Sequence, residues 1–140
     1  IEIVKEIRKD IKNIHIVLTG RKRNYVINEL EKENIKYSYF KMTDLTTLNE
    51  LYNCLNLYIV SSRFEGGPQS ILECGVTKTP IISTDVGVAS EILAPESIFQ
   101  MHNFKDAKPN IEFAYKNSMK YEMHESFKLF NNMFTAVYEN

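Results

Sequence analysis

The sequence predicts an α/β fold with a doubly wound, parallel, Rossmann-like sheet. Two observations support this class. Short apolar runs alternate along the chain with segments whose apolar residues recur at helical spacing, which is typical of parallel strands joined by helices. The apolar run Leu57–Val60 is followed by a glycine-rich turn and a helix, and such turns face the ligand crevice at the carboxyl ends of parallel strands.

The elements of the first part follow from these periods. Ile1, Val4 and Ile7 mark one face of a first helix that extends to about residue 12. Asp44 or Thr46 can cap a later helix that runs to about residue 55 and contains Cys54. Between these helices we predict a helix at 24–33 and strands at 14–18 and 36–41, and a third strand follows at 57–61.

The second part continues the alternation and then changes character. Pro68 suits the first position of a helix that directs Ile71, Leu72, Gly75 and Val76 inward. We expect Gly75 to let this helix pack tightly on the sheet. After residue 109 only helices are predicted. The remaining predicted elements are a strand at 80–84, a short helix at 89–93, an edge strand at 97–101, and helices at 111–119 and 122–138.

Composition limits the function classes. A chain of 140 residues with 44% hydrophobic residues fits one globular domain, residues 1–140, with C-terminal helices from about 110. The net charge of −1 gives no argument for nucleic-acid binding. No membrane span or signal peptide is visible, and two cysteines are too few for a disulfide scaffold, so we expect a reduced, cytoplasmic setting with both cysteines in the core.

The chain offers no pattern for metal or hydrolase chemistry. His15, His102 and His124 are scattered, and we expect His15 to be a buried strand residue. No nucleophile elbow is present. We therefore expect neither a metal nor another cofactor.

Two glutamates frame the most informative turn. Glu65 and Glu73 are separated by seven residues in the run Ser61-Ser62-Arg63-Phe64-Glu65-Gly66-Gly67-Pro68-Gln69-Ser70-Ile71-Leu72-Glu73. The pattern Pro80-Ile81-Ile82-Ser83-Thr84-Asp85-Val86-Gly87 follows, and Glu91 comes four residues later. This region, from about residue 44 to 93, resembles the donor-binding, C-terminal half of the retaining glycosyltransferases of family 4, which have the GT-B fold and an E-x7-E signature.

The resemblance implies roles for matching residues. Glu73 would accept hydrogen bonds from the nucleotide ribose, and Glu65 would hold a hydroxyl of the donor sugar. Carboxylates are acceptors suited to paired hydroxyls, and glycine lets the main chain approach a ligand closely. Taken singly, Glu73 could instead be a solvated helix residue, and Glu65 could be a charge that favours a helix start. The turn residues implied to contact sugar and phosphate through the main chain are Gly66, Gly67, Pro68, Gln69 and Ser70.

Basic residues are further candidates for the donor diphosphate. Arg21 and Arg23 follow the first strand, where their charge opposes the dipole of the next helix; a solvated turn is an equal alternative. Arg63 lies beside the signature turn. Gly87 is expected to support the turn after the next strand, where Val88 replaces a glycine that many family members have. The usual phosphate-binding arginine and lysine of the family have no counterpart here.

The resemblance also implies a function and partners. The chain would be the donor domain of an enzyme that moves a hexose-type sugar from a nucleoside diphosphate to a sugar, lipid or protein acceptor, in surface polysaccharide or glycoconjugate synthesis. The acceptor would bind an N-terminal domain absent from this chain, so the chain alone would be inactive. The full-length enzyme would be cytoplasmic or peripheral to the membrane. Two alternatives are an epimerase or phosphorylase of similar fold and a non-catalytic association domain.

The last predicted helix has an aromatic stripe. Phe127, Phe130 and Phe134 recur with Met133 and Val137 on one face. We expect this face to pack back onto the domain. In the family that the sequence resembles, the terminal helix often reaches toward the partner domain, so exposure of part of the stripe is the alternative.

Overall fold

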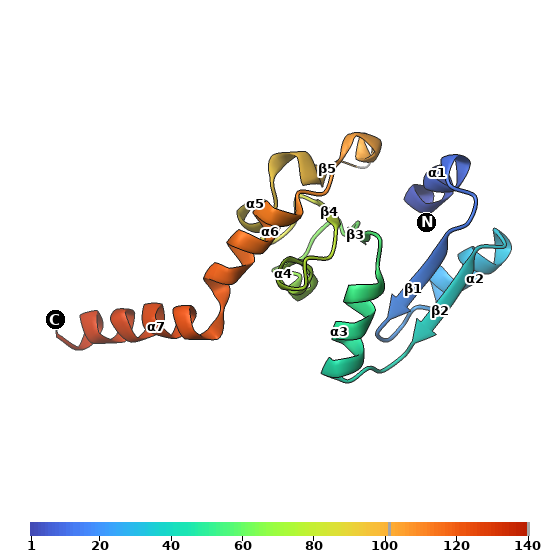
Figure 1. The fold of residues 1–140 in the computed structure, drawn as a ribbon. Coiled ribbons are helices and arrows are strands. Elements are labelled where there is room, and N and C mark those ends of the chain that lie inside the picture. The colour runs from blue at the N-terminus through green and yellow to red at the C-terminus, as the bar shows by residue number, and fades with distance from the viewer. Residues whose placement is uncertain (101, 140) are drawn as a thin grey trace. The chain divides into compact units, whose positions relative to one another are not determined.

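The chain folds as an α/β protein in which every paired strand is parallel. The computed structural model describes residues 1–100 and 102–139, and the chain divides into two compact units, 1–50 and 51–140. Each unit has its own small sheet, one of two strands and one of three (Figure 1). The predicted fold class is confirmed, but among the described residues the strands form two sheets where we expected one.

The first unit contains two strand–helix repeats. Its sheet pairs β1 (His15–Thr19) with β2 (Lys36–Phe40), with His15 opposite Lys36. Helices α1 (Glu2–Asp10) and α2 (Asn24–Lys32) precede the strands. The buried apolar side chains of this unit are Ile3, Leu30 and Ile35.

Helix α3 (Leu45–Cys54) leads from the first unit into the second. Asp44 caps it, because the backbone N–H of Thr47 donates to Asp44 Oδ1 at 2.7 Å. The same hydrogen bond lowers the pKa of Asp44. This result confirms the first of the two predicted capping residues.

The second unit has three parallel strands in the order β3-β4-β5. These are β3 (Tyr58–Val60), β4 (Ile81–Thr84) and the short β5 (Ile98–Phe99). Tyr58 pairs with Ile81, and Ser83 pairs with Ile98. Because all three strands run the same way, their carboxyl ends share one edge of the sheet, where the turns after β3 and β4 lie.

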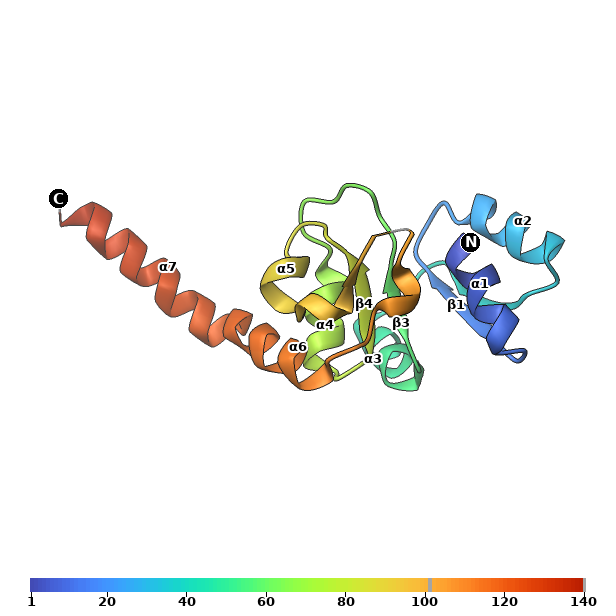
Figure 2. The same ribbon diagram turned by 90° about the horizontal axis from the view of Figure 1, so that it is seen from above.

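In the described part of the second unit, four α-helices and three short 3-10 turns complete the fold. Helix α4 (Gln69–Val76) follows β3, and α5 (Ala89–Ile92) follows β4. Helix α6 (Ile111–Ser118) packs beside α4 (Figure 2). The core includes Ile71, Ile82, Ile92 and Leu93. The other elements are the 3-10 turns Pro95–Ser97, Phe104–Asp106 and Met119–Tyr121 and the final helix α7 (Met123–Tyr138).

Helix α4 differs from its prediction in three details. Pro68 is the residue before the helix, with extended backbone, and Gln69 is the first helical residue. Val76 is exposed, whereas Cys74 is buried. Gly75 does allow close packing, but the partner is α6: a Cβ at Gly75 would lie 1.8 Å from Ser118 Oγ and 3.0 Å from the Ala114 carbonyl oxygen. Helical spacing located an apolar face without identifying the element that covers it.

Two predicted core residues are exposed. Cys54 lies at the exposed end of α3 and was wrongly expected in the core, although Cys74 is buried as predicted. His15 is also exposed, at the first position of β1, where its Nε2 lies 2.8 Å from Ser38 Oγ. Residues at the ends of helices and strands are less buried than residues at their centres, which accounts for both errors. Met101 of the predicted edge strand lies outside the described residues.

The aromatic face of α7 is exposed, so the expectation that it packs back onto the domain is wrong for this structure. Phe127, Phe130 and Phe134 have exposed fractions of 69%, 59% and 65%. The rings of Phe130 and Phe134 stack on each other with centroids 6.5 Å apart. The stripe therefore has contacts within its own helix and an uncovered outer face.

Candidate functional site

Two turns at the carboxyl ends of β3 and β4 form the candidate site. The first turn, residues 61–68, contains Glu65 and the glycine pair, and the second, residues 85–88, contains Gly87. The Thr84 hydroxyl donates to the Ser62 carbonyl oxygen at 2.7 Å and ties the strand ends together. Both turns therefore meet at the sheet edge where parallel folds bind ligands.

Gly87 is required where the two turns touch. Its φ of +53° is in the left-handed region, which glycine adopts without strain. A Cβ there would also lie 2.8 Å from both Cα and N of Gly67 and 2.9 Å from Pro68 Cδ. The second turn is thus seated directly on the first. Val88 is adjacent, because a Cβ at Gly67 would lie 3.9 Å from Val88 Cγ1.

An open pocket of about 510 Å³ lies between these turns. Arg63, Glu65 and Asp85 supply one cation and two carboxylates to its lining. Phe64, Gly66, Val86 and Gly87 complete it. Such a volume is in the range of pockets for small organic ligands. Carboxylates accept hydrogen bonds from hydroxyls, and a guanidinium suits phosphate oxygens, so the lining matches a ligand with both groups.

Glu65 is exposed and has one local partner. The Ser62 hydroxyl donates to its Oε1, which orients the carboxylate relative to the strand exit. The second oxygen is available for a ligand. The turn continues into α4, whose first N–H groups have no acceptor inside the helix. Pro68 has no N–H, so the main-chain donors of the predicted set are Gly66, Gly67, Gln69 and Ser70.

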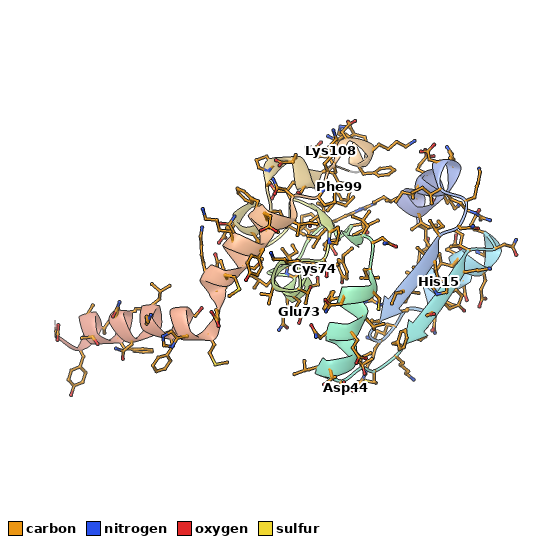
Figure 3. The ribbon with its side chains drawn as sticks, viewed as in Figure 1. His15, Asp44, Glu73, Cys74, Phe99 and Lys108 are labelled. Carbon is orange, nitrogen blue, oxygen red and sulfur yellow. The ribbon has the colours of Figure 1, made fainter. Side chains whose placement is uncertain are left out.

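Glu73 lies on α4 (Figure 3), where it contacts the buried Tyr52. The Tyr52 hydroxyl donates to Glu73 Oε2 at 2.6 Å, and the Tyr52 side chain is 6% exposed. The ring centroids of Tyr52 and Tyr58 are 5.6 Å apart. Burial, and then the hydrogen bond to Glu73, raises the pKa of Tyr52, so this hydroxyl keeps its proton and remains a donor.

The structure places the two glutamates in different surroundings. Glu65 lines the pocket between the turns, whereas Glu73 is not part of that lining and is held by Tyr52. One oxygen of Glu73 is occupied by the tyrosine, which leaves the other for a ligand. The ribose and sugar roles of these glutamates remain predictions.

The basic turn after β1 is in the other unit. Arg21 Nε lies 3.4 Å from Met42 Sδ, and Arg23 Nε donates to the Thr19 carbonyl oxygen at 2.8 Å. Both side chains are exposed, and Lys22 between them has a φ of +60°. The phosphate role of Arg21 and Arg23 also remains a prediction.

Four residues of the site were not among the predicted candidates. Phe64, Asp85 and Val86 line the pocket, and Tyr52 positions Glu73. Asp85 follows β4 directly, so its place at the strand end was a usable signal. Tyr52 lies in the predicted helix that runs to about residue 55, and nothing local in the sequence pairs it with Glu73, 21 residues away.

The described residues contain no cluster of three or more histidine, cysteine, aspartate or glutamate side chains that could hold a metal ion. Over the same residues, no helix has the length and apolar character needed to cross a membrane.

The family model described as "Glycosyl transferases group 1" matches residues 1–128 of the chain. Among curated proteins, none matches this chain.

Proposed function

The chain belongs to the group 1 glycosyl transferases, and we propose that it is the C-terminal, donor-binding domain of a retaining enzyme of family 4. The family implies a nucleotide-sugar donor and an acceptor. The observation that carries the proposal is the pocket between the interlocked turns, which combines Arg63 with the carboxylates of Glu65 and Asp85. A nucleoside diphosphate-sugar has the phosphates and hydroxyls that these groups recognise.

In this proposal Glu65 orients the donor sugar. Its carboxylate is fixed by Ser62 and lines the open pocket. Arg63 lies in the same lining, where its charge offsets the charge that develops on the leaving diphosphate. The main-chain N–H groups at the start of α4 add donors, and the positive end of the helix favours an anion.

Glu73 binds the ribose through the oxygen that Tyr52 leaves available. Tyr52 is a positioning residue, because its hydroxyl holds Glu73 Oε2 and does not itself meet the donor. Tyr58 packs against the Tyr52 ring and restricts its movement. A carboxylate held in one orientation loses less freedom when a hydroxyl binds.

The reaction proposed for the full enzyme needs no protein nucleophile. The diphosphate leaves while the acceptor hydroxyl attacks from the same face of the sugar, so the configuration is retained. The protein contributes positioning and charge stabilisation. The acceptor site belongs to an N-terminal domain in this proposal, and binding is therefore the suitable measurement for this chain.

Calorimetry with a panel of nucleoside diphosphates and their sugars tests the proposal. At least one of them should bind, and Glu73→Ala should weaken that binding by about tenfold or more, because charged hydrogen-bond acceptors contribute about 1.5–3 kcal/mol.

Glu112→Ala is the matched control, since it removes a carboxylate from the exposed face of α6, where Glu112 pairs with Lys78. Its affinity should equal that of the parent chain. Equal affinities for all three proteins would remove the ribose role, and the absence of binding across the panel would remove the donor-domain proposal. Circular dichroism of each variant shows that the fold persists.

A further inference from the structure

A second pocket lies in the first unit, away from the signature turns in sequence. Its volume is about 460 Å³, and it is formed where the chain enters β1 and β2. Arg8, Lys12, His15 and Lys36 line it together with Ile14 and Ile35. This is the amino-terminal end of the strand pair, opposite the end where the turns after the strands lie.

The lining carries positive charge without a carboxylate. Three of its residues are permanent cations near neutral pH and the fourth is a histidine, whereas no aspartate or glutamate is part of it. Asn13 and Asn34 contribute amide groups from the two entering loops. An unbalanced group of cations around a concave surface favours an anionic ligand.

Arg8 and Lys12 donate hydrogen bonds to main-chain carbonyl oxygens, which carry no negative charge that would neutralise them. Arg8 Nη1 donates to the Glu33 carbonyl oxygen, and Lys12 Nζ donates to the Lys9 carbonyl oxygen at 3.1 Å. The carboxylate of Glu33 pairs instead with Lys5, at 2.8 Å. Because guanidinium and ammonium groups have several N–H donors, further donors remain for a ligand.

Fold requirements explain only part of this cluster. Arg8 is in the last turn of α1, where a cation is favourable next to the helix C-terminus. His15 and Lys36, however, are directly paired across the parallel strands. Basic side chains at paired positions repel each other and do not stabilise the pairing of the strands. A bound anion would remove that repulsion.

We propose that this pocket binds a small organic phosphate. The phosphoryl group lies among Arg8, Lys12, His15 and Lys36, and the organic part lies against Ile14 and Ile35 with the asparagine amides as donors. The volume exceeds what a phosphate alone requires, and the apolar wall suits a carbon skeleton. The residues of this pocket all belong to the first unit, and none of them lines the pocket between the signature turns.

Titration of the chain with glucose 1-phosphate, followed by the amide NMR signals of Asn13, His15 and Lys36, tests the inference. These signals should shift and saturate, and sulfate or chloride at equal ionic strength should not reproduce the response. In Lys12→Gln/Lys36→Gln the dissociation constant should rise by about tenfold or more, since two charge-assisted contacts are lost.

The matched control is Lys9→Gln/Lys32→Gln. It removes the same charge from exposed lysines of the same unit that pair with Glu6 and Glu29. This control and the Glu73→Ala chain should both bind the probe like the parent. An equal loss in the two lysine double variants, or the absence of saturation, would overturn the proposal.

Vesicles distinguish a soluble ligand from a lipid headgroup. Co-sedimentation with vesicles of equal parts phosphatidylglycerol and phosphatidylcholine should be no greater than with phosphatidylcholine alone. Sedimentation with the anionic vesicles together with no response to glucose 1-phosphate would assign the pocket to a headgroup and refute the soluble-ligand proposal.

Discussion

The turn after β1 and the turn after β3 occupy equivalent places in the two units but are built differently. Each follows a parallel strand, contains glycine and leads into a helix. The turn after β3 is seated against a second turn through Gly87 and carries a pocket. The turn after β1 has a glycine with open surroundings, because the nearest atom to a Cβ at Gly20 would be Arg23 Nη2, at 3.5 Å.

The difference shows how a strand end acquires a pocket. Glycine and a helix start are common to both turns, so neither distinguishes them. The contact between neighbouring turns fixes the first turn and creates the concave surface that includes Glu65 and Asp85. The turn after β1 has exposed cations and is hydrogen-bonded to β2, because the Gly20 N–H donates to the Phe40 carbonyl oxygen at 3.1 Å and the Tyr39 hydroxyl donates to the Gly20 carbonyl oxygen at 2.9 Å.

The largest effect that would test this comparison is expected from Gly87→Ala. The new Cβ would clash with the Gly67 main chain and impose a left-handed backbone on alanine. We expect the free energy of unfolding to fall by about 2–4 kcal/mol, from the sum of strain and overpacking. Donor affinity should be lost as the turns separate. Chemical denaturation and calorimetry measure the two effects.

Gly20→Ala is the control for backbone strain alone. Its φ of +86° is also left-handed, but there is room for the Cβ. A loss of about 1 kcal/mol with normal donor affinity is expected. If both alanine variants behave alike, the contact between the turns has no special importance.

Replacing the arginines of each turn by alanine sharpens the comparison. Arg63 lines the pocket, so Arg63→Ala should weaken nucleoside diphosphate binding by about tenfold, the loss expected for one charged contact. Calorimetry measures it. The hypothesis that Arg21 and Arg23 hold the diphosphate requires a similar loss in Arg21→Ala/Arg23→Ala. An unchanged affinity in that double variant would remove these residues from the site.

The smallest effect concerns the tyrosine network of the second unit. Burial and the Glu73 hydrogen bond raise the pKa of Tyr52 above its ordinary value of 10.0. The unfolded chain loses this proton near pH 10, whereas the folded chain retains it. The contribution to stability is therefore complete below that pH and is lost as the pH rises above it.

Tyr52→Phe should make this alkaline loss of stability shallower by about 1.4 kcal/mol per pH unit, the value for one proton. Urea unfolding at a series of pH values above neutrality measures the slope. Tyr25→Phe, at a side chain that is 74% exposed, is the matched control for the loss of a tyrosine hydroxyl outside the core. Identical slopes for Tyr52→Phe and the parent would show that Tyr52 does not titrate as the buried contact requires.

Local pattern predicted most elements because strand and helix periods are properties of neighbouring residues. The predicted strand at 36–41 is β2, and the predicted helix at 111–119 is α6, each within one residue. Sheet pairing and the covering of apolar faces depend on distant residues. The division into two sheets, the packing of Gly75 on α6 and the exposed face of α7 were therefore not deduced.

In the candidate site, too, local motifs could be predicted from the sequence, whereas contacts between distant residues could not. The glutamates and the glycine turn form one contiguous motif, so they can be recognised from the sequence. The donation from Tyr52 to Glu73 and the seating of Gly87 on Gly67 join separate segments and emerge only in three dimensions. Sequence identifies the groups that meet a ligand more readily than the groups that hold them in place.

The two cysteines differ in exposure, which provides a single site for labelling with a thiol reagent. Cys54 is exposed at the end of α3, whereas Cys74 is enclosed in α4, and burial raises the pKa of its thiol. Maleimide reagents react with accessible thiolates, so one fluorophore or spin label attaches at Cys54 without mutagenesis. Cys54 is the last residue of the helix that carries Tyr52, so the spectrum of such a label would test whether a nucleotide binds near the Tyr52–Glu73 pair, as proposed.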